Sequence, residues 1–244
     1  MSAPFLGFWV RAMKLMIADV ARAFGVTENT IGQWVRQRNL PVHEMNSQYR
    51  FDRAELIEWA ATNQIPLKFD IFGSGNGGRS GRVSLARAIE RGGVATNVTG
   101  DSPAEIFRHA LEGMVGWTDP QFEEVVELIA ARQCMGGTSV GDGIAIPHPR
   151  MPVVVPDGEP LLRTCYLAQP WDVGAPDGIP VEVLFILLTP TVHVHLQLLA
   201  RLASILVDPD FRRLIKSRPD QTRLLAAVRA LESGMQESEP AGGA

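Results

Sequence analysis

The chain has 244 residues, of which 45% are apolar and 20% charged, with a formal net charge of −4. This length holds one large or two small domains with a buried core, and the charge does not indicate a chain that binds nucleic acid along its whole surface. Two cysteines imply no disulfide framework and favour a reducing compartment. No apolar run approaches the ~20 residues that cross a bilayer, so we expect a cytoplasmic protein without a membrane segment.

Residues 14–67 have the pattern of a small helical domain, and residues 1–12 are either an extension or a segment that packs on it. Apolar residues recur at helical spacing from Ile17 to Phe24, and Gly25 follows as a left-handed cap. Thr27 is placed to cap a second helix and Asp52 a third. Short extended runs between these two helices predict a hairpin.

The order helix, glycine turn, helix, hairpin, helix resembles the winged helix-turn-helix of the excisionase and MerR-like families. The resemblance rests on IADVARAFGVTENTIGQWVRQRNLP and on YRFDRAELIEWA. It implies that the second helix enters the major groove of DNA and that the hairpin touches the DNA backbone. Amide and guanidinium groups pair with base edges, and guanidinium groups also hold phosphates. The candidate DNA-binding residues are Asn29, Gln33, Arg36, Arg38 and Arg50.

Charge leaves an alternative open for this domain. Residues 1–68 carry eight Lys or Arg and six Asp or Glu, a net charge of only +2. Glu28 and Glu44 lie where they would oppose DNA phosphates. Docking of another protein is therefore the competing function of the domain.

Residues 70–84 are predicted to be a flexible, glycine-rich linker. The segment GSGNGG, residues 73–78, matches G-x-G-x-x-G, but Asp70 falls in the strand that a dinucleotide-binding motif needs, and no third element follows the next helix. A flexible tether is the favoured interpretation.

Residues 85–231 alternate between helical and strand patterns, which predicts an α/β domain whose mixed β-sheet is flanked by helices. The apolar run VEVLFILL, residues 181–188, is typical of a strand buried on both faces. Strands are also expected at 93–98 and 163–169. Residues 233–244 are small and polar and are predicted to form a disordered tail. The expected helices are 85–91, 103–114, 120–132, 195–207, 211–216 and 220–231.

The stretch GGTSVGDGIAIPHPR, residues 136–150, places His148 after a glycine-rich loop and between two prolines. Such a loop can turn backbone N–H groups toward an anion, and the prolines restrict the histidine to extended conformations. Arg132 ahead of the loop supplies positive charge, Thr138 a hydroxyl, and His195 a second imidazole. These groups suit attack of His148 on a phosphoryl group.

Two other interpretations of the histidines remain open from the residues alone. His148 could be a packed turn residue without chemistry. His148, His193 and His195 together offer three nitrogen ligands for zinc, although a glycine-rich anion loop has no purpose for a metal cation.

The segment MGGTSVGDGIAIPHPR resembles the phosphorylation site of the enzyme IIA proteins of the bacterial phosphotransferase system, of the mannitol, fructose and nitrogen-regulatory class. The resemblance continues through DGIPV and HLQLLARLASIL and covers roughly residues 85–231. It implies that His148 is the phospho-acceptor and that His195 supports the phosphoryl group. It further implies that Arg132 and Thr138 match the family's arginine and loop hydroxyl, with no cofactor and no metal.

Pro149 departs from the family pattern, which usually has a small residue there. It removes an N–H beside His148 and so favours a regulatory phospho-sensor over a fast sugar relay. The sequence thus predicts a phosphocarrier that accepts a phosphoryl group from an HPr-like carrier and is coupled to DNA and to regulated target proteins. The alternative is an unphosphorylated interaction or DNA-binding regulator, in which the second domain is a sensor or a dimerisation unit.

Overall fold

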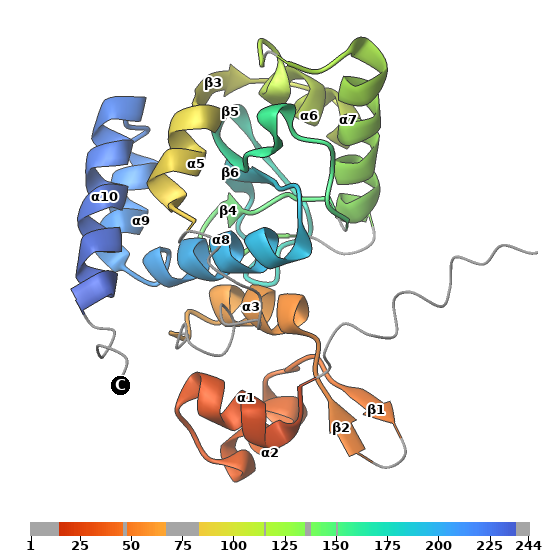
Figure 1. Ribbon diagram of the computed structural model, residues 1–244, viewed down its shortest axis with the longest axis vertical. Coiled ribbons are helices and arrows are strands. Elements are labelled where there is room, and N and C mark those ends of the chain that lie inside the picture. Colours follow the sequence, from red (N-terminus) through yellow and green to blue (C-terminus); the bar gives the residue numbers. More distant parts are fainter. Residues whose placement is uncertain are drawn as a thin grey trace, which may run out of the picture.

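A computed structural model describes residues 15–45, 48–66, 83–114, 116–134, 138–149 and 151–237 (Figure 1). A small, mainly helical domain is followed by a larger α/β domain, as the sequence predicts. In the small domain the elements are α1 (Ile17–Phe24), α2 (Glu28–Gln37), β1 (His43–Met45), β2 (Gln48–Arg50) and α3 (Arg53–Thr62).

Local signals set the ends of these helices where the sequence places them. Gly25 follows α1 with φ of 66°, a left-handed conformation that costs glycine little. The Thr27 hydroxyl oxygen accepts a hydrogen bond from the backbone N–H of Thr30. The Asp52 carboxylate accepts two from the first turn of α3. These caps satisfy amides that have no partner within their helix.

The larger domain is built on a four-stranded mixed sheet with the strand order β3-β5-β6-β4. The central strands β5 (Leu161–Trp171) and β6 (Val181–Leu188) are antiparallel. The outer strands β3 (Val94–Val98) and β4 (Ile144–Ala145) each run parallel to their neighbour. The mixed sheet expected from the sequence is therefore confirmed, whereas the two residues of β4 are too few to carry a strand pattern.

Helices cover both faces of this sheet (Figure 1). Along β6, Val183, Phe185 and Leu187 face one core and Leu184 and Ile186 the other, as expected for a strand buried on both faces. The first face is covered by α5 and α8 to α10, and the second by α6 and α7. These helices are α5 (Leu85–Gly92), α6 (Pro103–Leu111), α7 (Asp119–Cys134), α8 (Val192–Ile205), α9 (Pro209–Lys216) and α10 (Gln221–Glu237), with a short 3₁₀ turn at Pro156–Gly158.

Two predicted boundaries are corrected. Helix α10 continues to Glu237, so residues 233–237 are helical rather than part of a disordered tail. Ser84 belongs to the packed domain rather than to the linker, because its hydroxyl caps α5 and donates to the Glu232 carboxylate. Residues 67–82, most of the predicted linker, and residues 238–244 lie outside the described part of the chain.

The two domains pack against each other, although a flexible linker between them would also allow them to separate. Helix α3 of the small domain lies on α8 of the large one (Figure 1). Buried apolar side chains of both domains form one continuous core, in which Leu56 and Ile57 of α3 share a cluster with Leu198 and Leu199 of α8. The two domains are therefore mechanically coupled through α3.

Over the part of the chain that the structure describes, the helices are too short or too polar to traverse a bilayer.

Gly92 tests the fit of α5 against the sheet. A Cβ at this position would overlap the carbonyl group of Leu162 and lie 2.7 Å from the nitrogen of Arg163. We expect Gly92→Ala to lower the free energy of unfolding by about 2 kcal/mol or more, because backbone atoms must shift to make room. Urea unfolding followed by circular dichroism measures the change.

The matched control is Gly234→Ala in α10, where an added Cβ meets nothing within 4 Å. Alanine favours helix over glycine, so this variant should be neutral or more stable by up to about 1 kcal/mol. Equal unfolding midpoints for the two variants would contradict the packing described here.

Candidate functional site

The segment that carries His148 is fixed by its ties to the sheet. The backbone N–H of Val140 donates to Ile144 O, and that of Ile146 donates to Thr138 O, which closes the turn ahead of β4. Beyond β4, the carbonyl of Pro147 accepts from the N–H of Leu187 in β6. His148 therefore emerges one residue past an anchored point of the central sheet.

In the described half of the glycine loop, two backbone amides are bonded to protein side chains. Gly141 N–H donates to the Ser139 hydroxyl, and Asp142 N–H donates to the Asp177 carboxylate at 2.6 Å. Gly141 and Gly143 have φ of 79° and 73° and serve the tight turn. Gly136 and Gly137 lie outside the described residues.

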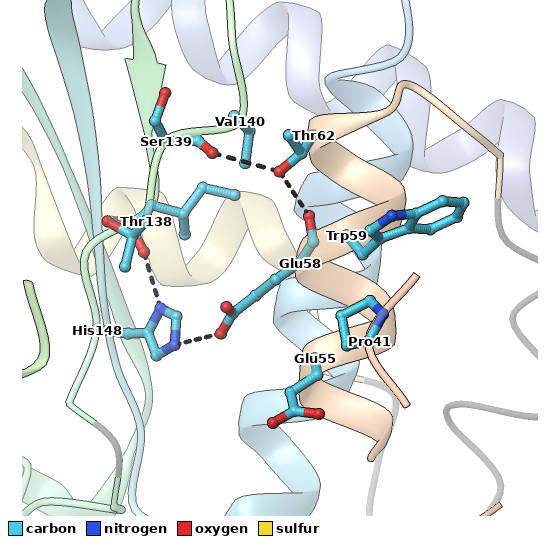
Figure 2. Close-up of a pocket in the computed structure, with 10 residues that line it drawn as sticks. Pro41, Glu55, Glu58, Trp59, Thr62, Thr138, Ser139, Val140 and His148 are labelled. Carbon is cyan, nitrogen blue, oxygen red and sulfur yellow. Dashed lines mark hydrogen bonds and ion pairs between the residues drawn. The ribbon is translucent and has the colours of Figure 1, made fainter. Parts of the chain in front are cut away.

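The predicted pair of histidines comes together at this site. His148 is only 3% exposed, and its ring centroid lies 4.9 Å from that of His195 on α8. The Nδ1 atom of His148 is 2.8 Å from the carbonyl oxygen of Ile146, which leaves Nε2 as the nitrogen that faces the opening (Figure 2). The second imidazole is thus placed beside the predicted phospho-acceptor.

The His195 ring is held neutral by its surroundings. Burial lowers the pKa of His195 to about 3, the neighbouring His148 adds to this effect, and Glu58 opposes it. The backbone N–H of His195 is bonded to Thr191 O inside α8, so the side chain rather than the amide is available at the site. A neutral imidazole can donate one N–H to a phosphoryl oxygen.

Arg132 and Thr138 also converge on the site. Arg132 Nη2 donates to Glu58 Oε2 at 2.8 Å, and the Thr138 hydroxyl, beside His148, donates to Gln133 Oε1. His193 turns elsewhere, with its Nε2 3.2 Å from Gln197 Nε2. Among the described residues, no group of three His, Cys, Asp or Glu side chains is arranged to hold a metal ion.

Glu58, which the sequence interpretation missed, is a central residue of the site. Its Oε1 lies 3.0 Å from His148 Nε2, while its Oε2 accepts from Arg132 (Figure 2). Burial raises the pKa of Glu58, but His148 and Arg132 together outweigh burial and hold the pKa below its ordinary value. Glu58 is therefore a carboxylate from the small domain inserted into the histidine site of the large one.

Arg212 is hydrogen-bonded to the glycine loop that precedes β4. Its guanidinium donates to the carbonyls of Gly141 and Val140 and lies 3.8 Å from the Asp142 carboxylate. Burial lowers the pKa of Arg212, and Asp142 and Asp177 oppose this shift. No local pattern in the sequence indicates this role, because Arg212 lies 71 residues after Gly141.

Helix α2 lies on the side of the small domain away from the large one (Figure 1), and four of the five predicted DNA-binding residues lie on or just after it. Asn29, Gln33, Arg36 and Arg38 are exposed on or just after α2. Arg50 on β2 is half-buried and donates to Gln48 Oε1 and to the carbonyl of Tyr49. The docked second domain therefore leaves the exposed side chains of α2 uncovered.

Comparison with known proteins follows the same division of the chain. Residues 94–230 match the family model described as phosphoenolpyruvate-dependent sugar phosphotransferase system, EIIA 2, and residues 15–64 match a helix-turn-helix domain. The chain is 31% identical to the nitrogen regulatory protein of Pseudomonas aeruginosa over 156 residues, covering 62% of this chain and 99% of that protein. It is 36% identical to the nitrogen regulatory protein of Bradyrhizobium diazoefficiens over 106 residues, 43% and 67% of the two chains. The solved structure of nitrogen regulatory protein IIA-Ntr from Neisseria meningitidis aligns with a TM-score of 0.46 and 25% identity over 60% of this chain and 96% of that one.

The α/β domain with the mixed sheet matches the enzyme IIA family model, and a helix-turn-helix domain precedes it. Since the family model spans more than half of the chain, the chain belongs to the EIIA type 2 family of the phosphotransferase system. Both relatives named above are nitrogen regulatory proteins.

The low pKa of His195 predicts an acid-sensitive fold. Between pH 6.5 and about 3, the unfolded chain binds a proton at this residue that the folded chain does not, so stability falls as the pH drops through that window. Glu58, with its lowered pKa, acts in the same direction below its unfolded value of 4.5. We expect His195→Gln to flatten the stability profile by up to about 1.4 kcal/mol per pH unit.

Urea unfolding at a series of pH values gives these slopes, which are compared rather than the absolute stabilities. His193→Gln, on the same helix, measures what the loss of a histidine does to the slope in general. Parallel profiles for the wild type and His195→Gln would show that His195 is not held neutral.

Proposed function

We propose that the protein is a regulatory phosphoprotein in which His148 accepts a phosphoryl group from an HPr-like phosphocarrier, and in which the helix-turn-helix domain binds DNA. The observation that supports this most strongly is the convergence of His148, His195 and Arg132 on one point. A buried nucleophile, a neutral hydrogen-bond donor and a fixed cation suit transfer of an anionic group. Carrier, protein and DNA would meet in the cytoplasm.

In the proposed transfer, the lone pair on Nε2 of neutral His148 attacks the phosphorus of the carrier's phosphohistidine. A nitrogen–phosphorus bond forms at His148 as that of the carrier breaks, and its electron pair returns to the carrier's ring nitrogen. His148 keeps its Nδ1 proton, which donates to the carbonyl of Ile146. That hydrogen bond stabilises the positive charge on the phosphorylated ring, so the step needs no proton transfer.

The neighbouring groups would receive the phosphoryl oxygens. Arg132 offers its guanidinium, and His195 offers an N–H from a neutral ring. Pro147 and Pro149 supply no N–H on either side of His148. The site therefore depends on side chains more than on backbone amides, which suits a slow regulatory acceptor better than a fast sugar relay.

The second partner would be DNA, through the exposed face of α2. Amide and guanidinium side chains lie there together, and the enzyme IIA domain does not cover them. DNA occupancy would then link the phosphorylation state of the transport system to transcription, either directly or through regulated target proteins. The competing function is a sensor that binds the carrier without accepting phosphate.

Incubation with enzyme I, HPr and labelled phosphoenolpyruvate should place one acid-labile phosphoryl group on the full-length protein. Mass spectrometry under alkaline conditions should map it to His148. His148→Ala should abolish the label, and Arg132→Ala should slow labelling by about tenfold or more, because it removes the cation that stabilises the transferred group. Carrier binding without any label would favour the sensor.

Binding to a duplex selected from a random-sequence library should weaken steeply with salt, because phosphate contacts release counterions. Arg36→Ala should cost about 1–3 kcal/mol of binding free energy if it reads a base, or reduce the salt slope by about 1 if it holds a phosphate. Arg22→Ala on α1, whose guanidinium pairs with Asp19, is the charge-matched control. Fluorescence anisotropy measures both quantities, and a flat salt response would instead indicate protein docking.

A further inference from the structure

Helix α3 of the helix-turn-helix domain closes the phosphorylation site of the enzyme IIA domain. Glu58 and Thr62 on this helix face His148 and Ser139 across the domain interface (Figure 2). The Thr62 hydroxyl lies 3.3 Å from the carbonyl oxygen of Ser139, and a cavity of about 310 Å³ between the two domains is lined by residues of both. A phosphocarrier must reach His148 from this same side, because its other faces are packed against the sheet and α8.

The Glu58 carboxylate makes the contacts that a phosphoryl group on His148 would make. One oxygen lies 3.0 Å from His148 Nε2, and the other accepts from Arg132 at 2.8 Å. A covalent nitrogen–phosphorus bond is much shorter than 3.0 Å, so phosphoryl oxygens attached to Nε2 would occupy the position of the carboxylate. The negative charge of the Glu58 carboxylate would also be repelled by the phosphoryl group, which carries a charge of roughly −1.5 to −2.

The docked arrangement also removes the nucleophile. His148 Nδ1 faces a carbonyl oxygen, and Nε2 faces a carboxylate that its neighbours keep ionised. Both contacts are satisfied together only when both ring nitrogens donate, which makes the ring an imidazolium. An imidazolium has no lone pair on Nε2 and cannot attack phosphorus.

We propose that docking of α3 and phosphorylation of His148 are mutually exclusive, with Glu58 acting as a built-in substitute for the phosphoryl group. This inference rests on the proposed function of His148 as a phospho-acceptor. The carrier competes with α3 for one surface, and the phosphorylated protein has its two domains separated.

The linkage between the two events is reciprocal. Docking lowers the rate of phosphorylation by reducing the fraction of molecules in which Nε2 is free. A bound phosphoryl group in turn removes the docked state. Because the exposed side chains of α2 are uncovered while α3 is docked, phosphorylation changes where the enzyme IIA domain sits relative to DNA rather than uncovering the DNA-reading helix.

The rate of phosphorylation of the full-length protein tests the competition. Labelling is measured with enzyme I, HPr and phosphoenolpyruvate, and separately with phosphoramidate, a small donor that needs no protein docking. Glu58→Ala should raise the initial rate with both donors by about fivefold or more, because the free state becomes more populated. Glu58→Gln, which keeps the shape and loses the charge, should lie between Glu58→Ala and the wild type.

Glu55→Gln is the matched control, with the same change of charge on the same helix and along the same cavity. The Glu55 carboxylate pairs with His43 of its own domain and does not touch His148. Its rates should stay within about twofold of the wild type. Urea unfolding of each variant separates a faster rate from a loss of fold.

Small-angle X-ray scattering of the wild-type protein supplies a readout independent of any substitution. Stoichiometric phosphorylation should increase the radius of gyration, and removal of the label should reverse the increase. An unchanged radius in the labelled protein would overturn the inference, as would equal labelling rates for the wild type and Glu58→Ala. No label on His148 in any variant with either donor would instead refute the proposed function, and with it this inference.

Discussion

The contact on which the arrangement of the two domains depends is the carboxylate of Glu58 held between His148 and Arg132. The Glu58 side chain is 27% exposed, so its carboxylate loses part of its hydration, and charged partners at both oxygens offset that loss. Both partners come from the enzyme IIA domain: Arg132 lies near the end of α7, and His148 lies just after β4. Neither domain alone completes the group, so the charge pattern specifies one docking position, whereas apolar packing of α3 on α8 would tolerate several.

The enzyme IIA domain contributes rigidity to that contact. The Pro147 carbonyl is tied to β6, Arg212 holds the turn ahead of β4, and α8 carries His195 against the same sheet. The backbone of His148 is therefore fixed relative to the sheet and does not move together with Glu58 of α3. The other side of the contact is α3, which packs on α8 while its Asp52 cap and the contacts of Trp59 with Phe24 and Trp34 tie it to the small domain.

Most helices and strands of this structure can be predicted from the sequence, whereas the contact of Glu58 with His148 cannot, for a specific physical reason. Local signals predict the elements, and the predicted ends lie within a few residues of the observed ones. Examples are the caps Thr27 and Asp52 and the apolar run of β6. His148 and His195 were paired through family resemblance, and the geometry brings them together. Glu58 lies 90 residues before His148 and carries no motif. One signal was present, since α3 buries Leu56, Ile57, Trp59, Ala60 and Ala61 around more than one stripe of its surface, which indicates a second packing partner. A glycine-rich linker allows two domains to separate but does not require it, so its composition is no evidence against docking.

The strength of the Glu58 contact limits what kind of device this can be. Buried ion pairs contribute little net stability relative to apolar packing, yet loss of one partner costs about 3–5 kcal/mol because the other charge stays buried. In the proposed exchange, a phosphoryl group on His148 would offer oxygens to the same guanidinium and so would not leave Arg132 unpaired. It therefore removes the carboxylate without leaving the cation buried and unpaired. In the proposed switch one anion replaces another at a fixed cation, so separation of the domains would not carry the added cost of an unpaired buried guanidinium.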